Sequence, residues 1–511
     1  MIMECSWVIF LAFIVMSFLL IMPHLRKGTS GHRRLPPGPP GWPVFGNTFD
    51  LGPMPHRSLA QLRHKYGDVL WLKLGAINTM VILSSKAAAE FFKNHDLSFV
   101  ERTVTETSRV YGYHKGSVAL ANYGSYWRVM RRLVTVEMLV NKRIRETAFL
   151  RRKCVDDMLL WIEEEAGKAN CGVHVARFVF LMTFNLLGNL MLSKDLFGPD
   201  SEEGSEFFVA MEGIMEWGGH ANMSDIFPWL RRLDPQGLRR KMERDMGKAM
   251  KIASKFVKER KNSTDQQYVE RERKKDFLDV LLEYEGNGND EPAKISDDEL
   301  NIFILEIFLA GSETTSSTIE WALTELIRSP KAMNKAKTEL TQVVGPNGKV
   351  EESDIEKLPY LQAVIKETLR LHPPIPFLVP RRAKNDTNFM GYFIPKNTQV
   401  FVNAWAIGRD PDVWADEPMC FKPERFMVGP NSSTDYKGQH FEFIPFGAGR
   451  RMCAGVPLAH RVLHLVLGSL LHHFDWELDA SVDVETMDMK DRLGITVRKF
   501  EPLLAIPTKC I

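Results

Sequence analysis

The segment that decides the fold is Phe446-Gly447-Ala448-Gly449-Arg450-Arg451-Met452-Cys453-Ala454-Gly455. Its glycines allow a tight backbone turn and a close approach to a flat object. Cys453 follows two arginines and precedes a helical pattern at 458–474, so its sulfur would lie near positive charge and near the N–H groups of a helix N-terminus. These surroundings stabilise a thiolate, which is a strong, soft metal ligand. The segment therefore predicts a cysteine-ligated metal.

Haem iron fits this segment better than zinc does. Zinc prefers about four ligands, whereas haem iron can be held by a single axial thiolate. The chain contains no CxxC, which excludes zinc ribbons and thioredoxin chemistry. A dinucleotide fingerprint is excluded because Met452 stands where a third glycine is required. His460 and His464 have the spacing of a zincin helix, but Arg461 replaces the necessary glutamate, so we interpret them as ordinary helix residues.

A long helix is predicted upstream of this segment. Ser296 and Glu299 form a capping box before the apolar run 300–309, and Ser329-Pro330 ends the pattern. A helix of roughly 30 residues spans ~45 Å, the width of a sizeable domain. Its centre, AGSETTSST at 310–318, contains a glycine and many hydroxyl side chains, which disfavour or bend helices. This centre indicates either a local break that marks a functional site or a polar patch packed against another helix.

The remaining elements predict a mainly α fold with a small β region. A β-hairpin is expected from strands at 69–74 and 79–83, joined by a turn at 75–78. After it, helical patterns dominate, as at 86–95, 145–168 and 176–192.

The composition is that of a globular protein. The 511 residues are 44% hydrophobic and 25% charged, which excludes disordered, collagen-like and disulfide-scaffold classes. The 66 Lys and Arg against 64 Asp and Glu leave a net charge of +2, so nothing in the overall charge favours nucleic acid as a partner. The six cysteines are sparse and irregularly spaced, which predicts free thiols in a reducing compartment.

The N-terminus predicts a membrane anchor. The run from Ser6 to Met22 is apolar and uncharged, with Glu4 before it and four basic residues soon after it. This charge asymmetry favours an uncleaved single-pass helix, with the rest of the chain in the cytosol, over a signal peptide. We expect the anchor at 1–25, a basic and proline-rich hinge at 26–45, and one catalytic domain at 46–511.

Five motifs together resemble those of cytochrome P-450 enzymes, the haem-thiolate monooxygenases. The segment at 446–455 is similar to the family's cysteine-ligand loop, and AGSETT at 310–315 to its oxygen-activation motif. Glu367-Thr368-Leu369-Arg370 matches E-x-x-R, Pro423-Glu424-Arg425-Phe426 matches P-E-R-F, and Trp127 to Arg131 matches W-x-x-x-R. The motifs lie in family order from the hinge to the end of the chain. The resemblance implies the cytochrome P-450 fold, mainly α with a small β region, preceded by one N-terminal membrane helix.

The resemblance also assigns roles to single residues. Cys453 would be the axial iron ligand of haem b, and its thiolate would favour O–O cleavage. Thr314 would hydrogen-bond bound dioxygen or a water, and Glu313 would relay protons. The haem propionates and ring would be contacted by Arg451, Arg131, Trp127, Arg381 and Phe446. Arg450 and Arg382 are expected elsewhere, and Glu367, Arg370 and Arg425 resemble a structural salt-bridge triad.

The substrate pocket is expected to be apolar. Four regions would line it: Val104–Asn122, the helix around Phe303–Ala310, Ile375–Val379 and Gly494–Val497. Apolar residues predominate in the last two regions, which favours a lipophilic substrate, although some of these residues would serve only as core packing. FIPFGAGRRMCAG and VNAWAIGRDP (402–411) resemble the plant microsomal group that contains geraniol hydroxylases and iridoid oxidases. This predicts oxidation of a monoterpenoid or iridoid; the alternative substrate class is flavonoid or phenylpropanoid.

The resemblance implies partners and a location. No flavin, iron–sulfur or dinucleotide motif is present, so electrons from NADPH would arrive through a separate reductase, with cytochrome b5 as a further partner. The expected location is the endoplasmic reticulum membrane. A haem protein of another class, either a peroxide-rearranging enzyme or a sensor, is the second hypothesis. The pair Glu313–Thr314 argues against it, because rearranging relatives typically lack that pair.

Overall fold

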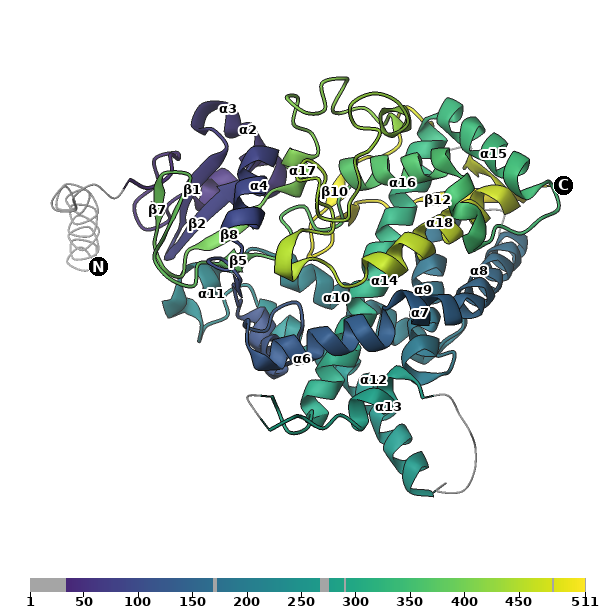
Figure 1. Ribbon diagram of the computed structural model, residues 1–511, viewed down its shortest axis with the longest axis horizontal. Helices are drawn as coiled ribbons and strands as arrows, with labels where there is room; N and C mark the ends of the chain where they lie inside the picture. The colour runs from purple at the N-terminus through teal and green to yellow at the C-terminus, as the bar shows by residue number, and fades with distance from the viewer. Residues whose placement is uncertain (1–33, 169–171, 267–274, 289–290, 480–481, 511) are drawn as a thin grey trace, which may run out of the picture.

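A computed structural model describes residues 34–168, 172–266, 275–288, 291–479 and 482–510. Helices make up most of it, and a small β region lies at one side, as the sequence predicts (Figure 1). The main helices besides the central one are α4 (Ser85–Asn94), α6 (Ser125–Leu133), α8 (Ala148–Lys168), α9 (Val175–Leu192), α10 (Glu202–Gly219), α12 (Leu238–Gln266), α15 (Pro330–Val344), α16 (Pro359–Leu371) and α18 (Val456–His473).

The central helix is α14 (Asp297–Arg328), which runs through the middle of the molecule (Figure 1). The predicted capping box is present: Ser296 Oγ accepts from the Glu299 backbone N–H at 3.3 Å, and the Glu299 carboxylate accepts from the Ser296 N–H at 2.9 Å. Pro330 begins α15 directly after it. This helix packs along α9 and α18, so it forms the axis of the hydrophobic core.

Of the two alternatives for the centre of this helix, a local break and a packed polar patch, the structure does not contain the break. α14 is helical without interruption from Asp297 to Arg328. Its hydroxyl side chains donate to carbonyls of the preceding turn, as Thr314 Oγ1 does to Ala310 O at 2.7 Å and Thr318 Oγ1 to Thr314 O at 2.8 Å. These bonds satisfy the hydroxyl groups inside the helix without breaking its backbone pattern.

A second expected helix is divided in two. The pattern at 145–168 forms α7 (Asn141–Glu146) and α8, separated at Thr147. Thr147 itself has φ −103° and ψ 12°, outside the helical region, so the chain turns at this residue instead of continuing as one helix.

The β region is built around the predicted hairpin. Its strands are β1 (Val69–Leu74) and β2 (Ile77–Ile82), paired antiparallel with Leu74 opposite Ile77, so the turn is shorter than expected. The sheet has the order β1, β2, β8 (Gln399–Val402), β5 (Arg381–Arg382) and β3 (Glu101–Arg102), and only β2 and β8 among these pair in parallel. Smaller sheets pair β4 (Val173–His174), β12 (Leu504–Lys509) and β9 (Phe474–Leu478), then β10 (Asp491–Arg492) with β11 (Arg498–Lys499), and β6 (Thr387–Phe389) with β7 (Tyr392–Ile394).

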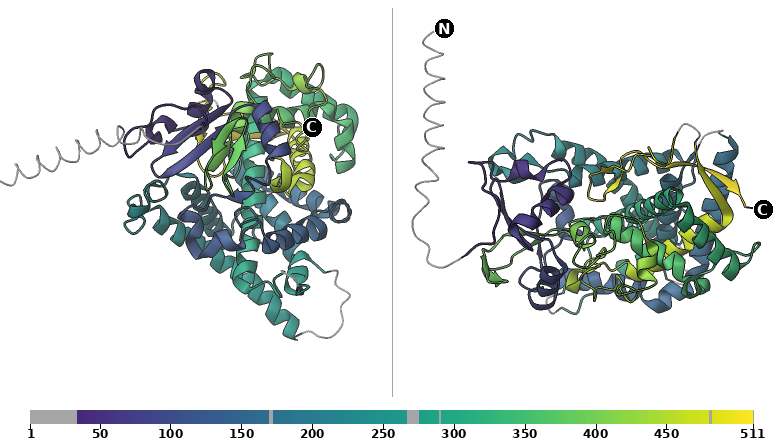
Figure 2. Two further views of the ribbon diagram at one scale, coloured as in Figure 1. Left: turned by 60° about the vertical axis from the view of Figure 1, so that its left-hand side comes forward. Right: turned by 90° about the horizontal axis from the view of Figure 1, so that it is seen from above.

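The N-terminal part that the structure describes lies against this sheet (Figure 2). Within the predicted hinge, the Pro37 carbonyl accepts from the Trp71 N–H of β1 at 2.8 Å. The predicted membrane helix at 1–25 lies outside the described residues. Among the described residues, one helix is long and apolar enough to cross a membrane, α9, and it is mostly buried in the core.

Candidate active site

The cysteine loop folds back on itself before α18. Its glycines Gly447 and Gly449 have φ of 71° and 70°, in the left-handed region that favours glycine. A Cβ at Gly449 would stand 2.6 Å from the Asp96 carboxylate, so this position also needs glycine for space. The Cys453 N–H donates to Phe446 O at 3.0 Å and closes the loop. The sequence argument for a tight turn ahead of a helix is therefore confirmed.

The Cys453 side chain is accessible, although protein atoms surround it closely. The residue is exposed, yet desolvation by the surrounding protein is the largest influence on its thiol and raises its pKa. The backbone N–H groups of Gly455 and Val456 and the guanidinium of Arg131 act in the opposite direction and favour the thiolate. Next to it, Ala454 packs against the core cluster that includes Leu305 and Leu309 of α14. The sulfur thus remains accessible, with the guanidinium of Arg131 and two backbone N–H groups beside it.

Two of the predicted haem contacts lie together. The buried Arg451 guanidinium lies 4.4 Å from the Trp127 ring centre. Arg451 donates to the carbonyls of Val100, Val118 and Ala121, and Trp127 Nε1 donates to the same Val118 carbonyl at 2.9 Å. This shared carbonyl joins the cysteine loop to α6.

Arg381 is held by a buried acid. Its guanidinium pairs with Asp96 at 2.6 Å and donates to Ala448 O at 3.1 Å. Arg450, which was expected elsewhere, binds the other oxygen of Asp96 through its side chain and its N–H, each at 3.1 Å. About half of the Arg450 side chain is nevertheless exposed. Asp96 thus ties β5 to the cysteine loop.

Arg102 is a further member of this cluster that sequence reasoning missed. It is buried, donates to Ala119 O at 2.9 Å, and lies opposite Arg381 in the β3–β5 pair. Burial, and the nearby charges of Arg381 and Arg451, hold the pKa of Arg102 well below its usual range. The only sequence signal was a short charged pair, Glu101-Arg102, which does not reveal its strand partner.

The arginine cluster fits the carboxylates of haem. Arg102, Arg381 and Arg451 are buried within mutual electrostatic reach, and within the described segments the only carboxylate in an ion pair with any of them is Asp96. Arg131 has no hydrogen bond or ion pair to its guanidinium among the described residues. Glu306 acts on Arg102 and Glu101 acts on Arg451, but among the described residues neither acid forms an ion pair with these arginines. Guanidinium groups bind carboxylates strongly. A flat ligand with two propionates matches this donor set beside Cys453.

The acid and the alcohol of α14 face different surroundings. Thr314 is half-buried, and Ala310, one turn earlier, is exposed, so this part of a core helix borders accessible space. Glu313 is 1% exposed, and its Oε1 lies 3.1 Å from Arg498 Nη1. Burial raises the Glu313 pKa, and Arg498 lowers it. Among the described residues no hydrogen bond joins the Glu313 carboxylate to Thr314, so the structure does not bring the pair together.

The C-terminal segment joins α14 to the part of the chain that precedes the expected pocket region 375–379. The Val497 N–H donates to Pro374 O at 2.7 Å, and Ser317 Oγ of α14 donates to Val497 O at 3.0 Å. Ile495 is 37% exposed, whereas Phe377 stacks on Phe401 in the β region, so the latter acts as core packing. Helix α10 also reaches this place, since the Ile495 N–H donates to Met215 O at 2.8 Å. Sequence reasoning missed α10, because its amphipathic pattern carries no chemical motif.

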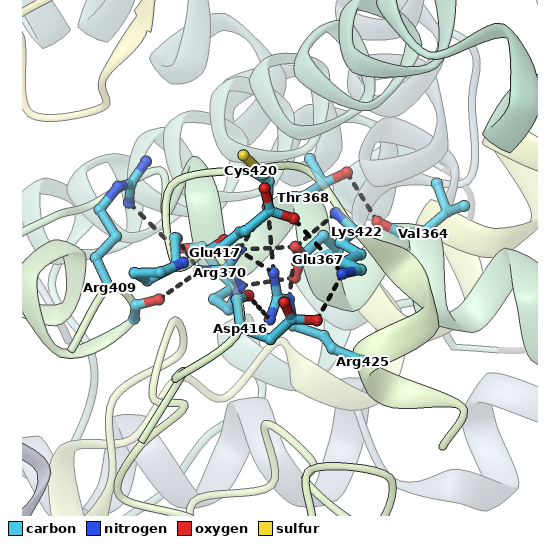
Figure 3. Close-up of polar contacts among 12 residues, drawn as sticks. Val364, Glu367, Thr368, Arg370, Arg409, Asp416, Glu417, Cys420, Lys422 and Arg425 are labelled. Carbon is cyan, nitrogen blue, oxygen red and sulfur yellow. Dashed lines mark hydrogen bonds and ion pairs between the residues drawn. The ribbon is translucent and has the colours of Figure 1, made fainter. Parts of the chain in front are cut away.

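The predicted structural triad is present (Figure 3). The Glu367 carboxylate binds Arg370 at 2.6 and 2.7 Å and Arg425 at 2.9 Å, and all three residues are buried. Arg370 also donates to the carbonyls of Gly408, Pro418 and Cys420, and Arg425 to those of Asp416 and Glu417. The triad thus connects α16 to the segment that leads into the cysteine loop.

Comparison with known proteins is consistent with this geometry. The family model for cytochrome P450 matches residues 36–504. The chain is 56% identical to cytochrome P450 76A2 of Solanum melongena over 99% of both chains. It is 54% identical to iridoid oxidase of Catharanthus roseus, over 96% of this chain and 95% of that one. A zebra fish cytochrome P450 solved with progesterone superposes with a TM-score of 0.75 at 25% identity, covering 89% of this chain and 99% of that one. The cysteine loop, the arginine cluster beside it and these matches lead to one conclusion: the chain belongs to the cytochrome P450 family.

Proposed function

We propose that this protein oxidises an unactivated C–H bond of a monoterpenoid or iridoid, by hydroxylation or by successive oxidation of one methyl group to a carboxylic acid. As a member of the family it is a haem-thiolate monooxygenase of the plant type. The similarity to iridoid oxidase over 96% of the chain is the observation that carries the choice of substrate class. The apolar residues of the expected pocket regions support it, since side chains such as Ile495 and Leu378 offer no polar group to a substrate.

The haem-binding residues in this proposal come from four parts of the chain. When bound, haem supplies the activation of dioxygen, to which an axial thiolate contributes electron density. Cys453 would hold the iron, with its charge stabilised by the N–H groups of Gly455 and Val456. The cofactor would also be held by the remaining predicted contacts and by one that only the structure shows: Arg451, Arg131, Trp127, Arg381 and Phe446 from the prediction, and Arg102 from the structure.

Thr314 and Glu313 deliver protons in this proposal. Thr314 is half-buried beside the exposed Ala310, so its hydroxyl can exchange its bond to the Ala310 carbonyl for one to oxygen or water. Glu313 is the buried acid on the same turn, with its pKa raised by burial. The Thr314 hydroxyl would hold the acceptor end of the path, and the Glu313 carboxyl would resupply the proton.

Replacing Thr314 with alanine is expected to uncouple turnover. The variant should keep haem and its thiolate spectrum, but product formed per NADPH should fall by at least about tenfold, with hydrogen peroxide accounting for the missing electrons. Thr315→Ala is the matched control, because Thr315 makes the same back-bond, to Gly311 O at 2.7 Å, and is buried. Equal coupling in the two variants would contradict the role of Thr314.

The membrane location and chain division are part of the proposal. Family members take electrons from NADPH through a reductase. For this chain we also propose cytochrome b5 as a partner, the endoplasmic reticulum membrane as its location, and a division into 1–25, 26–45 and 46–511.

One surface feature supports membrane contact: Phe45 lies 5.5 Å from Phe227 between ring centres, and Phe227 lies 5.1 Å from Trp229. Large exposed apolar side chains are found at this patch and near it: Trp42, Phe45, Phe49, Trp229 and Leu233. Exposed apolar side chains of this kind suit a lipid surface.

A substrate panel tests the proposed function. Microsomes of a yeast that expresses the full chain with a reductase would be given geraniol, nepetalactol and flavanones, with and without NADPH. We expect NADPH-dependent oxidation of a terpenoid, preceded by a substrate-induced shift of the haem spectrum. Turnover confined to flavanones would replace the terpenoid class by the phenolic one, and turnover of a peroxide without NADPH or reductase would overturn the monooxygenase reading of this site.

A further inference from the structure

Arg498 of β11 bridges carboxylates that come from two different helices. Its Nη1 lies 2.6 Å from Oε1 of Glu212 on α10 and 3.1 Å from Oε1 of Glu313 on α14. One guanidinium nitrogen therefore serves two acids. Exposure differs among the three side chains, at 16% for Arg498, 33% for Glu212 and 2% for Glu313.

The two contacts are unequal. Arg498 donates a well-directed hydrogen bond to Glu212, whereas the contact with Glu313 is an ion pair without hydrogen-bond geometry. Glu313 Oε1 is consequently a buried polar atom without a hydrogen-bond partner among the described residues. Buried oxygens are normally hydrogen-bonded, and a catalytic role is one of the explanations for an exception. Glu212 thus holds the nitrogen that Glu313 would otherwise bind.

The bridge depends on how α10 is seated. The turn between β10 and β11 is fastened to this helix by the bond from the Ile495 N–H to Met215 O and by an ion pair between Arg492 and Glu216. The backbones approach so closely that a Cβ on Gly219 of α10 would lie 2.0 Å from the Gly494 carbonyl carbon. A displacement of α10 would therefore carry this turn with it, and would change the position of Arg498 relative to Glu313 on α14.

We propose that Arg498 is a positioning residue for the proton-delivering acid Glu313, and that Glu212 competes with Glu313 for the same guanidinium nitrogen. The inference rests on the proposed function, in which Glu313 resupplies protons to Thr314. The chemistry is proton transfer alone: the Glu313 carboxylate gains a proton from hydronium and returns to carboxylate when it gives that proton to the Thr314 side. When Arg498 is bound to Glu212, the Glu313 carboxyl is free to turn toward Thr314.

The charges around Glu313 predict the direction in which each substitution shifts the Glu313 pKa. Burial raises the pKa of Glu313. Among the charges, Arg498 has the largest effect and lowers this pKa; Glu212 comes next and raises it, and Arg492 lowers it. Loss of Arg498 should therefore raise the Glu313 pKa, and loss of the Glu212 charge should lower it. Three other titratable groups face this cluster from α14, β11 and β4: Glu320, Lys499 and His174.

Infrared spectroscopy of the resting holoenzyme tests the proposal. The C=O band of protonated Glu313, identified by its loss in E313Q, would be titrated with pH in wild type, R498Q and E212Q. We expect the midpoint to rise by about one pH unit or more in R498Q, as for loss of a contact charge, and to fall in E212Q. The pH profile of NADPH oxidation with reductase and geraniol should move in the same two directions.

Two further variants separate positioning from structural support. R492Q breaks the ion pair between Arg492 of β10 and Glu216 of α10. It should raise the midpoint of the Glu313 titration less than R498Q does. R498K keeps the charge and should restore most of the wild-type midpoint. The proposal would be overturned if the Glu313 midpoint shifted in the same direction in R498Q and E212Q. It would also be overturned if the midpoint shifted as far in R492Q as in R498Q.

The infrared test can fail independently of the proposed function. Glu212 is one-third exposed, so we expect E212Q to fold and its Glu313 midpoint to be measurable even if R498Q does not fold. An unmoved midpoint in E212Q would then overturn the competition by itself. Absence of NADPH-dependent turnover in the wild type would instead count against the proposed function and would leave the infrared titration unchanged.

Discussion

Cys453→Ser is expected to abolish the thiolate-type Soret band of the reduced carbon monoxide complex and, with it, NADPH-dependent turnover. Serine is nearly the same size, so the loop closed by the Cys453 N–H and Phe446 O should persist. An alcohol, however, is a far weaker acid than a thiol, so serine forms no comparable anion and does not supply the soft donor. Haem content and the carbon monoxide difference spectrum of the purified variant measure the result.

The control for this prediction is a cysteine away from the site. Cys420 is exposed, and it enters the structural triad only through its carbonyl oxygen (Figure 3). Cys420→Ser should therefore keep the band and the activity of the wild type. Retention of the thiolate band in Cys453→Ser, or its loss in Cys420→Ser alone, would refute the assignment of the ligand.

Glu367→Ala is expected to lower the free energy of unfolding by about 3 to 5 kcal/mol. The carboxylate is fully buried and pairs with two buried guanidinium groups, Arg370 and Arg425. Its removal leaves both positive charges inside the protein without their acid, which costs far more than the loss of a surface pair. Urea unfolding followed by tryptophan fluorescence, together with the yield of folded protein, measures the effect.

A matched surface pair calibrates that result. Glu206 and Lys248 lie 3.1 Å apart, and each side chain is about half exposed. Glu206→Ala should cost about 0 to 1 kcal/mol, because solvent screens exposed ion pairs. The folded fraction of Glu367→Ala should still show the thiolate band, since the triad does not touch Cys453. Equal stability of the two variants would contradict a structural role for the triad.

Local rules predicted the elements that depend on neighbouring residues. The capping box of α14, the proline at its end, the hairpin and the tight loop before α18 each follow from residues close in sequence. At the centre of α14 local reasoning left a break and a packed polar patch open, and hydroxyl groups there bond back to the helix instead of breaking it. Tertiary packing on both sides of the helix outweighed the weak propensities there.

Contacts between distant segments were beyond such rules. Asp96 meets Arg381, Arg102 lies opposite Arg381 across two strands, and Arg498 reaches acids on two helices. Nothing in the spacing of these residues identifies their partners, because the pairing is set by strand register and by the packing of α10. The residues of the cysteine loop identified Cys453, and the family resemblance supplied the roles of Thr314 and Glu313. The structure supplied Arg102, Glu212 and Arg498.

The central claim is that the sulfur of Cys453 binds haem iron. Iron K-edge X-ray absorption on the purified holoprotein measures this bond directly. The account predicts one sulfur scatterer in the iron shell in addition to the porphyrin nitrogens, and its disappearance in Cys453→Ser. A shell of nitrogen and oxygen alone in the wild type, or a sulfur that survives the substitution, would contradict it.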